Sequence, residues 1–171
     1  MSNPELIASL ERVVARLVQA PDRTAAMTAA LAFLIDASGG DMGAVFEPAG
    51  TSLRLSFGHG LPPKFLRKPP LLETSAWEGA MIVNHPAGPA VDSDLGNHAR
   101  LAGVATWASL PIAYRDRFFG LVLVASRDLV GFSDQAVEVF SIISRVLGLA
   151  LYGLSHATPL RDPPPEVTTT D

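Results

Sequence analysis

Residues 118–126 form a nearly continuous apolar run, Phe-Phe-Gly-Leu-Val-Leu-Val-Ala-Ser. A short run of this kind is typical of a strand that is buried on both faces of a sheet. The preceding run, 106–114, is also largely apolar, and a polar triplet at 115–117 separates the two. The pattern predicts a β-hairpin with one central strand. Pro111 lacks a backbone N–H, so we expect its strand to bulge there or to lie at a sheet edge.

A second hairpin is predicted nearer the N-terminus. Residues 42–47 form a short apolar run, and residues 51–57 alternate between apolar and polar side chains. Strict alternation indicates a strand with one buried face, so Leu53, Leu55 and Phe57 are expected to share that face. The segment Pro-Ala-Gly between the two runs supplies the turn.

Three segments, 5–20, 22–38 and 133–154, have the periodicity of amphipathic helices. Asp22 and Ser133 stand where N-caps of the second and third helices are expected. The first helix has a near-heptad apolar seam, and the third is apolar over a wider surface than one sheet contact needs. We therefore predict that these two helices pack together and against a second subunit. The predicted dimer-interface residues are Leu6, Leu10, Val13, Leu17, Val139, Ile143, Val146 and Ala150.

The middle of the chain is irregular, because six prolines interrupt residues 58–103. A long irregular stretch inside a domain is usually functional or mobile. From residue 156 onward the chain is Pro-rich and polar, so 156–171 is predicted to be a disordered tail. We expect residues 1–155 to form one domain, with the sheet and a roof segment at 41–126.

Composition excludes several classes of site and partner. The chain has no cysteine, which excludes disulfides, zinc-thiolate sites, cysteine nucleophiles and cysteine-linked chromophores. The net charge of −4 argues against a nucleic-acid partner, because that binding needs clustered cations. The densest basic group, Lys64, Arg67 and Lys68, is interpreted as a solvated loop, with a phosphate contact as the lesser alternative. There is no signal-peptide pattern and no apolar run of about 18 residues, so we expect a cytoplasmic protein with no membrane partner.

The order helix, helix, hairpin, irregular middle, hairpin, helix resembles the GAF domain family over about residues 6–153. The likeness is carried by Leu-Pro-Ile at 110–112, the turn at 115–117, Phe-Gly-Leu-Val-Leu at 119–123 and Phe-Ser-Asp at 132–134. The resemblance implies an α+β fold with a central antiparallel sheet of about six strands. It places the N- and C-terminal helices on one face and an irregular helix and loop roof, covering a pocket, on the other. It also implies dimerisation through the first and last helices.

Members of the GAF family have several different activities and ligands, and this sequence excludes some of them. Methionine sulfoxide reductases and covalent bilin-binding proteins of this fold need cysteine, and the chain has none. The Asn-Lys-x-Phe-Asp-Glu signature of many cyclic-nucleotide-binding members is absent as well. Non-covalent haem bound through a histidine stays open, and the cofactor is otherwise unknown.

The residues able to bind a ligand gather mainly in the middle segment. Tryptophan could stack on a planar ligand, arginine could pair with a carboxylate or phosphate, and histidine could bind a ligand or haem iron. The plainer alternatives are a core tryptophan and exposed loop histidines. The ligand-binding candidates are His59, Trp77, His85, Asp92, His98, Arg100, Trp107 and Ser109. We find no nucleophile elbow, phosphate loop or zinc-binding motif, so no catalytic or metal site is predicted and the chain is not expected to be an enzyme. An enzyme on the same fold is the remote alternative.

Two hypotheses for function follow. In the first, the chain is a regulatory sensor domain that binds a small molecule under the roof and signals through a dimer to a kinase or transcription regulator. In the second, it is a ligand-free module for dimerisation or protein docking. Polar side chains pointing inward under the roof would favour the first hypothesis, and a collapsed apolar centre would favour the second.

Overall fold

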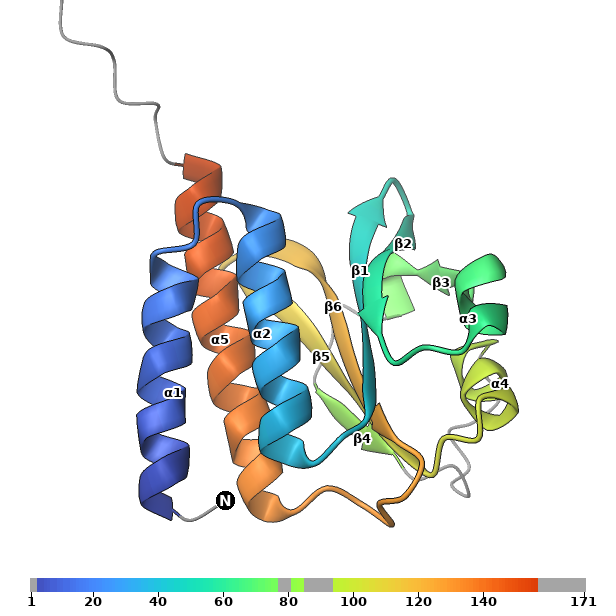
Figure 1. The fold of residues 1–171 in the computed structure, drawn as a ribbon. Helices are drawn as coiled ribbons and strands as arrows, with labels where there is room; N and C mark the ends of the chain where they lie inside the picture. The colour runs from blue at the N-terminus through green and yellow to red at the C-terminus, as the bar shows by residue number, and fades with distance from the viewer. Residues whose placement is uncertain (1–2, 77–80, 85–93, 157–171) are drawn as a thin grey trace, which may run out of the picture.

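The computed structural model describes residues 3–76, 81–84 and 94–156. In chain order the elements are α1 (Asn3–Val18), α2 (Arg23–Ser38), β1 (Met42–Ala49), β2 (Ser52–His59), α3 (Pro63–Arg67), β3 (Leu72–Glu73), a 3-10 turn (Thr74–Ala76), β4 (Ile82–Asn84), α4 (Asp94–Leu101), β5 (Thr106–Tyr114), β6 (Arg117–Ser126) and α5 (Asp134–His156). Figure 1 shows their arrangement. The predicted tail lies almost wholly outside the described residues, so the division of the chain at residue 155 stays a prediction.

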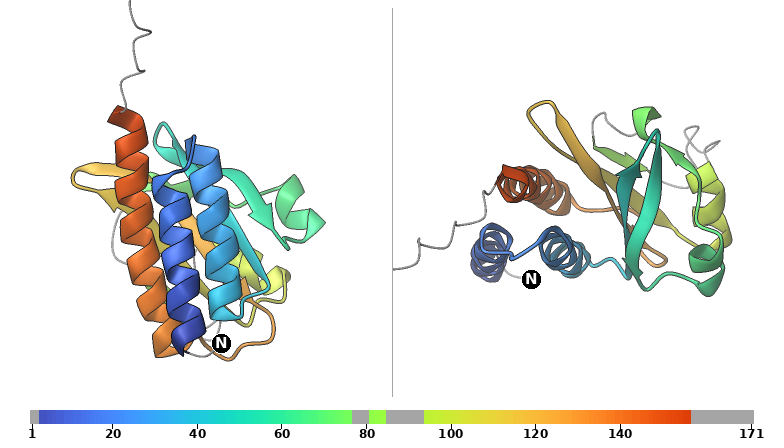
Figure 2. Two further views of the ribbon diagram at one scale, coloured as in Figure 1. Left: turned by 60° about the vertical axis from the view of Figure 1, so that its left-hand side comes forward. Right: turned by 90° about the horizontal axis from the view of Figure 1, so that it is seen from above.

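The six strands form one antiparallel sheet in the order β3-β2-β1-β6-β5-β4. Helices α2 and α5 cover one face, while α3 and α4 lie on the other side (Figure 1). Helix α1 packs on α2 and α5, over the groove between them, and forms an outer layer (Figure 2). The predicted α+β architecture, with terminal helices on one face and a roof on the other, is therefore confirmed.

Strand β6 is buried on both faces, as its apolar run predicted. Val122 and Val124 point into the core between sheet and helices, whereas Leu121 and Leu123 belong to the core under α3 and α4. Burial of an aliphatic side chain contributes roughly 1.5–3 kcal/mol, so a strand that supplies both cores holds the two layers together.

A bulge in the β1–β2 pair corrects one prediction. Val45 pairs with Phe57, but the next residue of β1 pairs with Leu55, so Ser56 is an extra residue. A one-residue slip turns the following side chains to the opposite face. Phe57 consequently packs on the helix side, while Leu53 and Leu55 pack on the roof side. The prediction that the three share one face is wrong.

Strand β5 behaves at its proline as expected. Its pairing with β4 runs from Trp107 to Ser109, so Pro111 lies past the last β5 residue that pairs with β4. The missing N–H of Pro111 therefore removes no bond to β4. The β5–β6 ladder also shifts register between Ile112 and Ala113, one residue beyond the proline.

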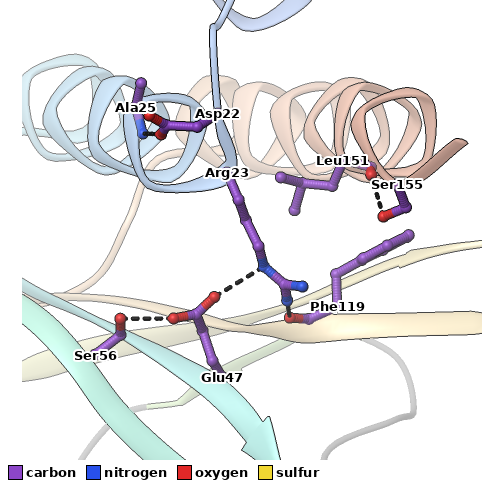
Figure 3. A network of polar contacts seen from close by, with 8 residues as sticks. All are labelled: Asp22, Arg23, Ala25, Glu47, Ser56, Phe119, Leu151 and Ser155. Carbon is purple, nitrogen blue, oxygen red and sulfur yellow. Dashed lines mark hydrogen bonds and ion pairs between the residues drawn. The ribbon is translucent and has the colours of Figure 1, made fainter. Parts of the chain in front are cut away.

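Local capping fixes the ends of α2 and α5. The Asp22 side chain accepts a hydrogen bond of 2.8 Å from the Ala25 N–H, as Figure 3 shows. Gly39, in the left-handed conformation, ends α2. Ser133 accepts from the Ala136 N–H at 3.2 Å. Caps of this kind stabilise a helix by about 1 kcal/mol and set its starting point.

Helix α5 is the one described helix that is long and apolar enough to cross a membrane, judged by length and composition alone. A core helix meets the same criterion. One face of α5 packs in the helix-side core through Phe140, Ile143, Leu147 and neighbouring residues. The apolar character of α5 is thus accounted for in part by the fold itself.

Candidate functional site

Helices α3 and α4 are fixed over the sheet by apolar anchors. Phe65 of α3 and Leu95 and Ala99 of α4 are buried in the roof-side core. Pro63 occupies the first turn of α3, where a missing N–H costs nothing. Gly103 follows α4 in the left-handed conformation and lets the chain turn into β5.

Between this roof and the sheet lies a small cavity of about 40 Å³. Its lining is apolar, with Leu61 and Phe65 from the roof and Trp107 and Leu123 from the sheet among its residues. Small-molecule sites usually measure about 300–1,000 Å³, whereas a water molecule takes about 30 Å³. This cavity is called here the sheet-side cavity. Its described part has room for about one water molecule, and its lining offers no polar group to bind that water.

A larger hollow lies between α3 and α4 and is called here the α3–α4 groove. Its volume is about 380 Å³. Three of its residues also line the sheet-side cavity, namely Pro62, Phe65 and Ala102. The remaining lining residues are Lys64, Arg67, Lys68, His98 and Leu101.

His98 links the two walls of this groove. Its Nε2 lies 3.1 Å from the Lys68 carbonyl oxygen. A carbonyl can only accept, so Nε2 carries the proton in this contact. The imidazole also meets the Phe65 ring edge-on, with ring centroids 5.8 Å apart. The end of α3 and the last turn of α4 are therefore held together by one side chain.

No protein-family model matches the sequence, and no curated protein matches it. Several solved structures match the fold over nearly their whole length. The GAF domain of the cyanobacteriochrome TePixJ has a TM-score of 0.71 at 16% identity, over 82% of this chain and 96% of that chain. The GAF domain of a phosphoenolpyruvate-protein phosphotransferase from Coxiella burnetii has a TM-score of 0.69 at 16% identity, over 90% and 97%. A domain of a two-component sensor histidine kinase protein from Sinorhizobium meliloti 1021 has a TM-score of 0.64 at 18% identity. The match covers 75% of this chain and 90% of that chain.

The chain has the GAF fold. The fold predicted from the sequence pattern is thereby confirmed. At these identities the likeness establishes the GAF fold alone, so any function has to rest on the geometry of this chain.

The five predicted ligand-binding residues that the structure describes do not lie at one site. Trp77, His85 and Asp92 lie outside the described residues. His98 lines the α3–α4 groove, and Trp107 is buried against the sheet-side cavity.

The remaining three candidates lie elsewhere. Arg100 is exposed on α4 and donates to the Asn97 side chain. The buried Ser109 hydroxyl lies 3.5 Å from the Ile82 carbonyl oxygen, across the β4–β5 pair. His59 ends β2 and lines a separate hollow beside α2, on the helix side.

Sequence reasoning missed part of the groove. The sequence indicates a basic cluster at Lys64, Arg67 and Lys68, but the interpretation as a solvated loop does not predict that they line a groove. The signal that could have shown more is Phe65, an aromatic residue among cations in a short Pro-initiated segment. In the residues that the structure describes, no group of three or more His, Cys, Asp or Glu is placed to hold a metal ion.

Helices α1, α2 and α5 pack together on one side of the sheet and are called here the helix layer. Their packing changes the interpretation of the predicted dimer residues. Five of the eight are buried within the single chain, namely Leu6, Val13, Leu17, Val139 and Ile143. Packing on α2, α5 and the sheet already explains their spacing. Leu10, Val146 and Ala150 are half-buried. A role for these eight residues in a dimer stays a prediction.

Other apolar side chains of the helix layer face solvent. Exposed fractions are 53% for Ile7, 68% for Val18, 42% for Ile142 and 50% for Leu149. With the half-buried Val14, these residues are called here the helix strip.

The helix strip follows one side of the helix layer. On α1, Ser9, Arg12 and Arg16 line a hollow shared with α2. At 100° per residue, Ile7 and Val18 lie on the opposite flank, which borders α5. Ile142 and Leu149 are seven residues apart and therefore on one face of α5. Helices α1 and α5 run side by side and in the same direction (Figures 1 and 2).

Proposed function

We propose that this chain is a regulatory module of a sensory signalling system and that it works as a homodimer through its helix layer. The helix strip is the observation that carries the proposal, because it places large apolar side chains in water on two adjacent helices. Solved structures of the same fold include a sensor histidine kinase domain, which supports a signalling role. The expected setting is the cytoplasm, with a kinase or transcription regulator as the downstream partner.

The spacing of the helix strip favours a second copy of the chain as its occupant. Ile7 and Val14 on α1 are seven residues apart, as are Ile142 and Leu149 on α5. Seven residues of helix span about 10.5 Å, so the two halves of the strip match in length. In a two-fold dimer the α1 half of each copy would lie along the α5 half of the other, and both contacts would form together.

Charge supports the same pairing. Glu11 follows Ile7 by four residues, and Arg145 follows Ile142 by three, so each lies one turn along the strip. Both side chains are exposed. In the proposed dimer Glu11 of one copy would face Arg145 of the other, which would add specificity more than affinity.

Analytical ultracentrifugation of the purified chain tests this proposal. We expect the wild type to sediment as a dimer at tens of micromolar, and Ile142→Asp with Leu149→Asp to sediment as a folded monomer, because burying two carboxylates in an apolar contact is costly. Val130→Asp is the matched control, since Val130 is exposed in the loop before α5. It should remain dimeric.

A charge swap gives a second readout. Glu11→Arg should weaken the dimer, and the double variant Glu11→Arg/Arg145→Glu should restore it. A monomeric wild type at about 100 μM, equivalent to a dimer weaker than about −5 kcal/mol, would contradict the proposal. So would a dimer that survives the Ile142 and Leu149 changes.

A second candidate function is small-molecule sensing, and the α3–α4 groove is the observation that favours it. Its volume of about 380 Å³ falls within the usual range for ligand sites, whereas the sheet-side cavity is far too small. Sensing and dimerisation are compatible, because a ligand that binds one arrangement of the roof better than another shifts the population toward it.

A further inference from the structure

The α3–α4 groove concentrates positive charge on a chain that is acidic overall. Lys64, Arg67 and Lys68 line it and are exposed. Among the described residues that line it, none carries a carboxylate, while the whole chain has a net charge of −4. Clustered cations without acidic neighbours attract anions, and arginine binds carboxylate or phosphate with two parallel hydrogen bonds.

The same groove presents apolar surface. Leu101 is 86% exposed at its edge, although it ends a helix whose other apolar residues are buried. Phe65 lies at the base, held in the roof-side core. Leu101 and Phe65 therefore place apolar surface beside the three cationic side chains. The groove thus combines a cationic rim with an apolar wall.

The walls of the groove are tied together before any ligand arrives. His98 donates to the Lys68 carbonyl, and the Lys68 N–H donates to the Lys64 carbonyl at 3.2 Å. Fixing the walls in advance lowers the entropy that binding would otherwise cost. Hydrogen bonds within the chain therefore join the two walls of the α3–α4 groove.

Size and charge limit the class of ligand. A hollow of about 380 Å³ holds a molecule of one or two rings and is far too small for a folded partner. Nucleic acid is disfavoured, since specific complexes neutralise many phosphates and bury about 1,000 Å² or more.

We propose that the α3–α4 groove binds a small anionic molecule with an aromatic or acyl portion. Lys64, Arg67 and Lys68 would hold its carboxylate or phosphate, and the apolar portion would lie against Phe65 and Leu101. The inference rests on the sensing candidate of the proposed function and names its site and ligand class.

Phenyl phosphate is the probe for this proposal, because it carries one ring and one phosphate. Titrations followed by ¹H–¹⁵N NMR should give saturable shifts confined to the amides of α3, residue 68 and α4. Inorganic phosphate alone and phenol alone are the half-probe controls, and each should bind much more weakly. Binding of inorganic phosphate as tightly as phenyl phosphate would overturn the apolar half of the proposal.

Charge reversal locates the anion. Arg67→Glu/Lys68→Glu should weaken phenyl phosphate binding by about tenfold or more, equivalent to at least about 1.4 kcal/mol. The matched control Arg12→Glu/Arg16→Glu reverses two exposed charges on α1 and should leave the dissociation constant unchanged.

The failures of the two proposals can be told apart. No saturable shift at about 10 mM probe, or equal binding by the Arg67/Lys68 variant and the wild type, would overturn the groove as a site. Shifts at Trp107 and Leu123 instead would keep sensing but move it to the sheet-side cavity. Analytical ultracentrifugation measures dimerisation independently, so its result does not depend on whether the groove binds the probe.

Discussion

At the scale of single residues, Gly120 decides how closely two strands approach. Its φ is +145°, which side chains rarely adopt. A Cβ atom placed there would lie 2.3 Å from the Phe46 carbonyl oxygen of the neighbouring strand. The obstacle is backbone, so it cannot rotate away. The sequence showed a Gly between apolar residues, but only the packing of β1 against β6 shows why no other residue fits.

Gly120→Ala is therefore expected to destabilise the chain by about 2–4 kcal/mol, through backbone strain and the clash with β1. Gly50→Ala is the matched control, because Gly50 has a φ of +69° but no atom within 4 Å of the added Cβ. The control should cost only about 1 kcal/mol. Urea unfolding followed by circular dichroism measures both, and equal losses would show that the clash does not matter.

At the scale of elements, one arginine fastens helix α2 to the sheet. Arg23 Nε lies 2.8 Å from Glu47 Oε1 on β1, and the guanidinium also donates to the Phe119 carbonyl on β6. The Ser56 hydroxyl donates to the other carboxylate oxygen of Glu47 at 2.6 Å. Figure 3 shows these contacts converging from α2, β1, β2 and β6. The sequence gives no sign of this network, because its members lie far apart along the chain.

A double-mutant cycle tests how strongly this contact couples helix to sheet. Arg23→Met should destabilise more than Glu47→Gln, because it also removes the donor to Phe119. The side chains of Arg23 and Glu47 are 41% and 33% exposed, so solvent screens the pair. We expect a coupling energy of about 0.5–1 kcal/mol that shrinks at high salt. A coupling near zero at low salt would mean that packing alone positions α2.

At the scale of the whole molecule, the helix layer links folding to assembly. The main contacts of helix α1 are with helices α2 and α5 and not with the sheet. Helix α1 therefore lies outside the α2–α5 pair (Figure 2). The apolar side chains on the inner face of α1 are buried within the chain. The outer flank of α1 carries the α1 half of the helix strip. If that flank is buried in a dimer, the native state gains stability that depends on protein concentration.

Thermal unfolding at several concentrations tests this linkage. The Tm of the wild type should rise by roughly 2 °C for each tenfold increase in concentration. The Tm of Ile142→Asp/Leu149→Asp should not change with concentration, while that of Val130→Asp should follow the wild type. A wild-type Tm independent of concentration over two decades would argue that the chain unfolds as a monomer.

Local signals in the sequence determined most of the secondary structure and the fold class. The apolar run at 118–126, the caps at Asp22 and Ser133, and the helical periodicities act over a few residues, so they can be read directly from the chain. Their order, together with the motifs at 110–112, 119–123 and 132–134, carries the resemblance from which the GAF fold is predicted.

Only the tertiary structure decided which partner each residue meets. The bulge at Ser56 turns Phe57 to the helix side. Packing of α1 on α2 and α5 buries Leu6 and Val13 within one chain. His98 joined Lys68 across thirty residues of sequence to complete the groove. Register, layer packing and groove formation depend on contacts between segments distant in sequence, and no local periodicity encodes them.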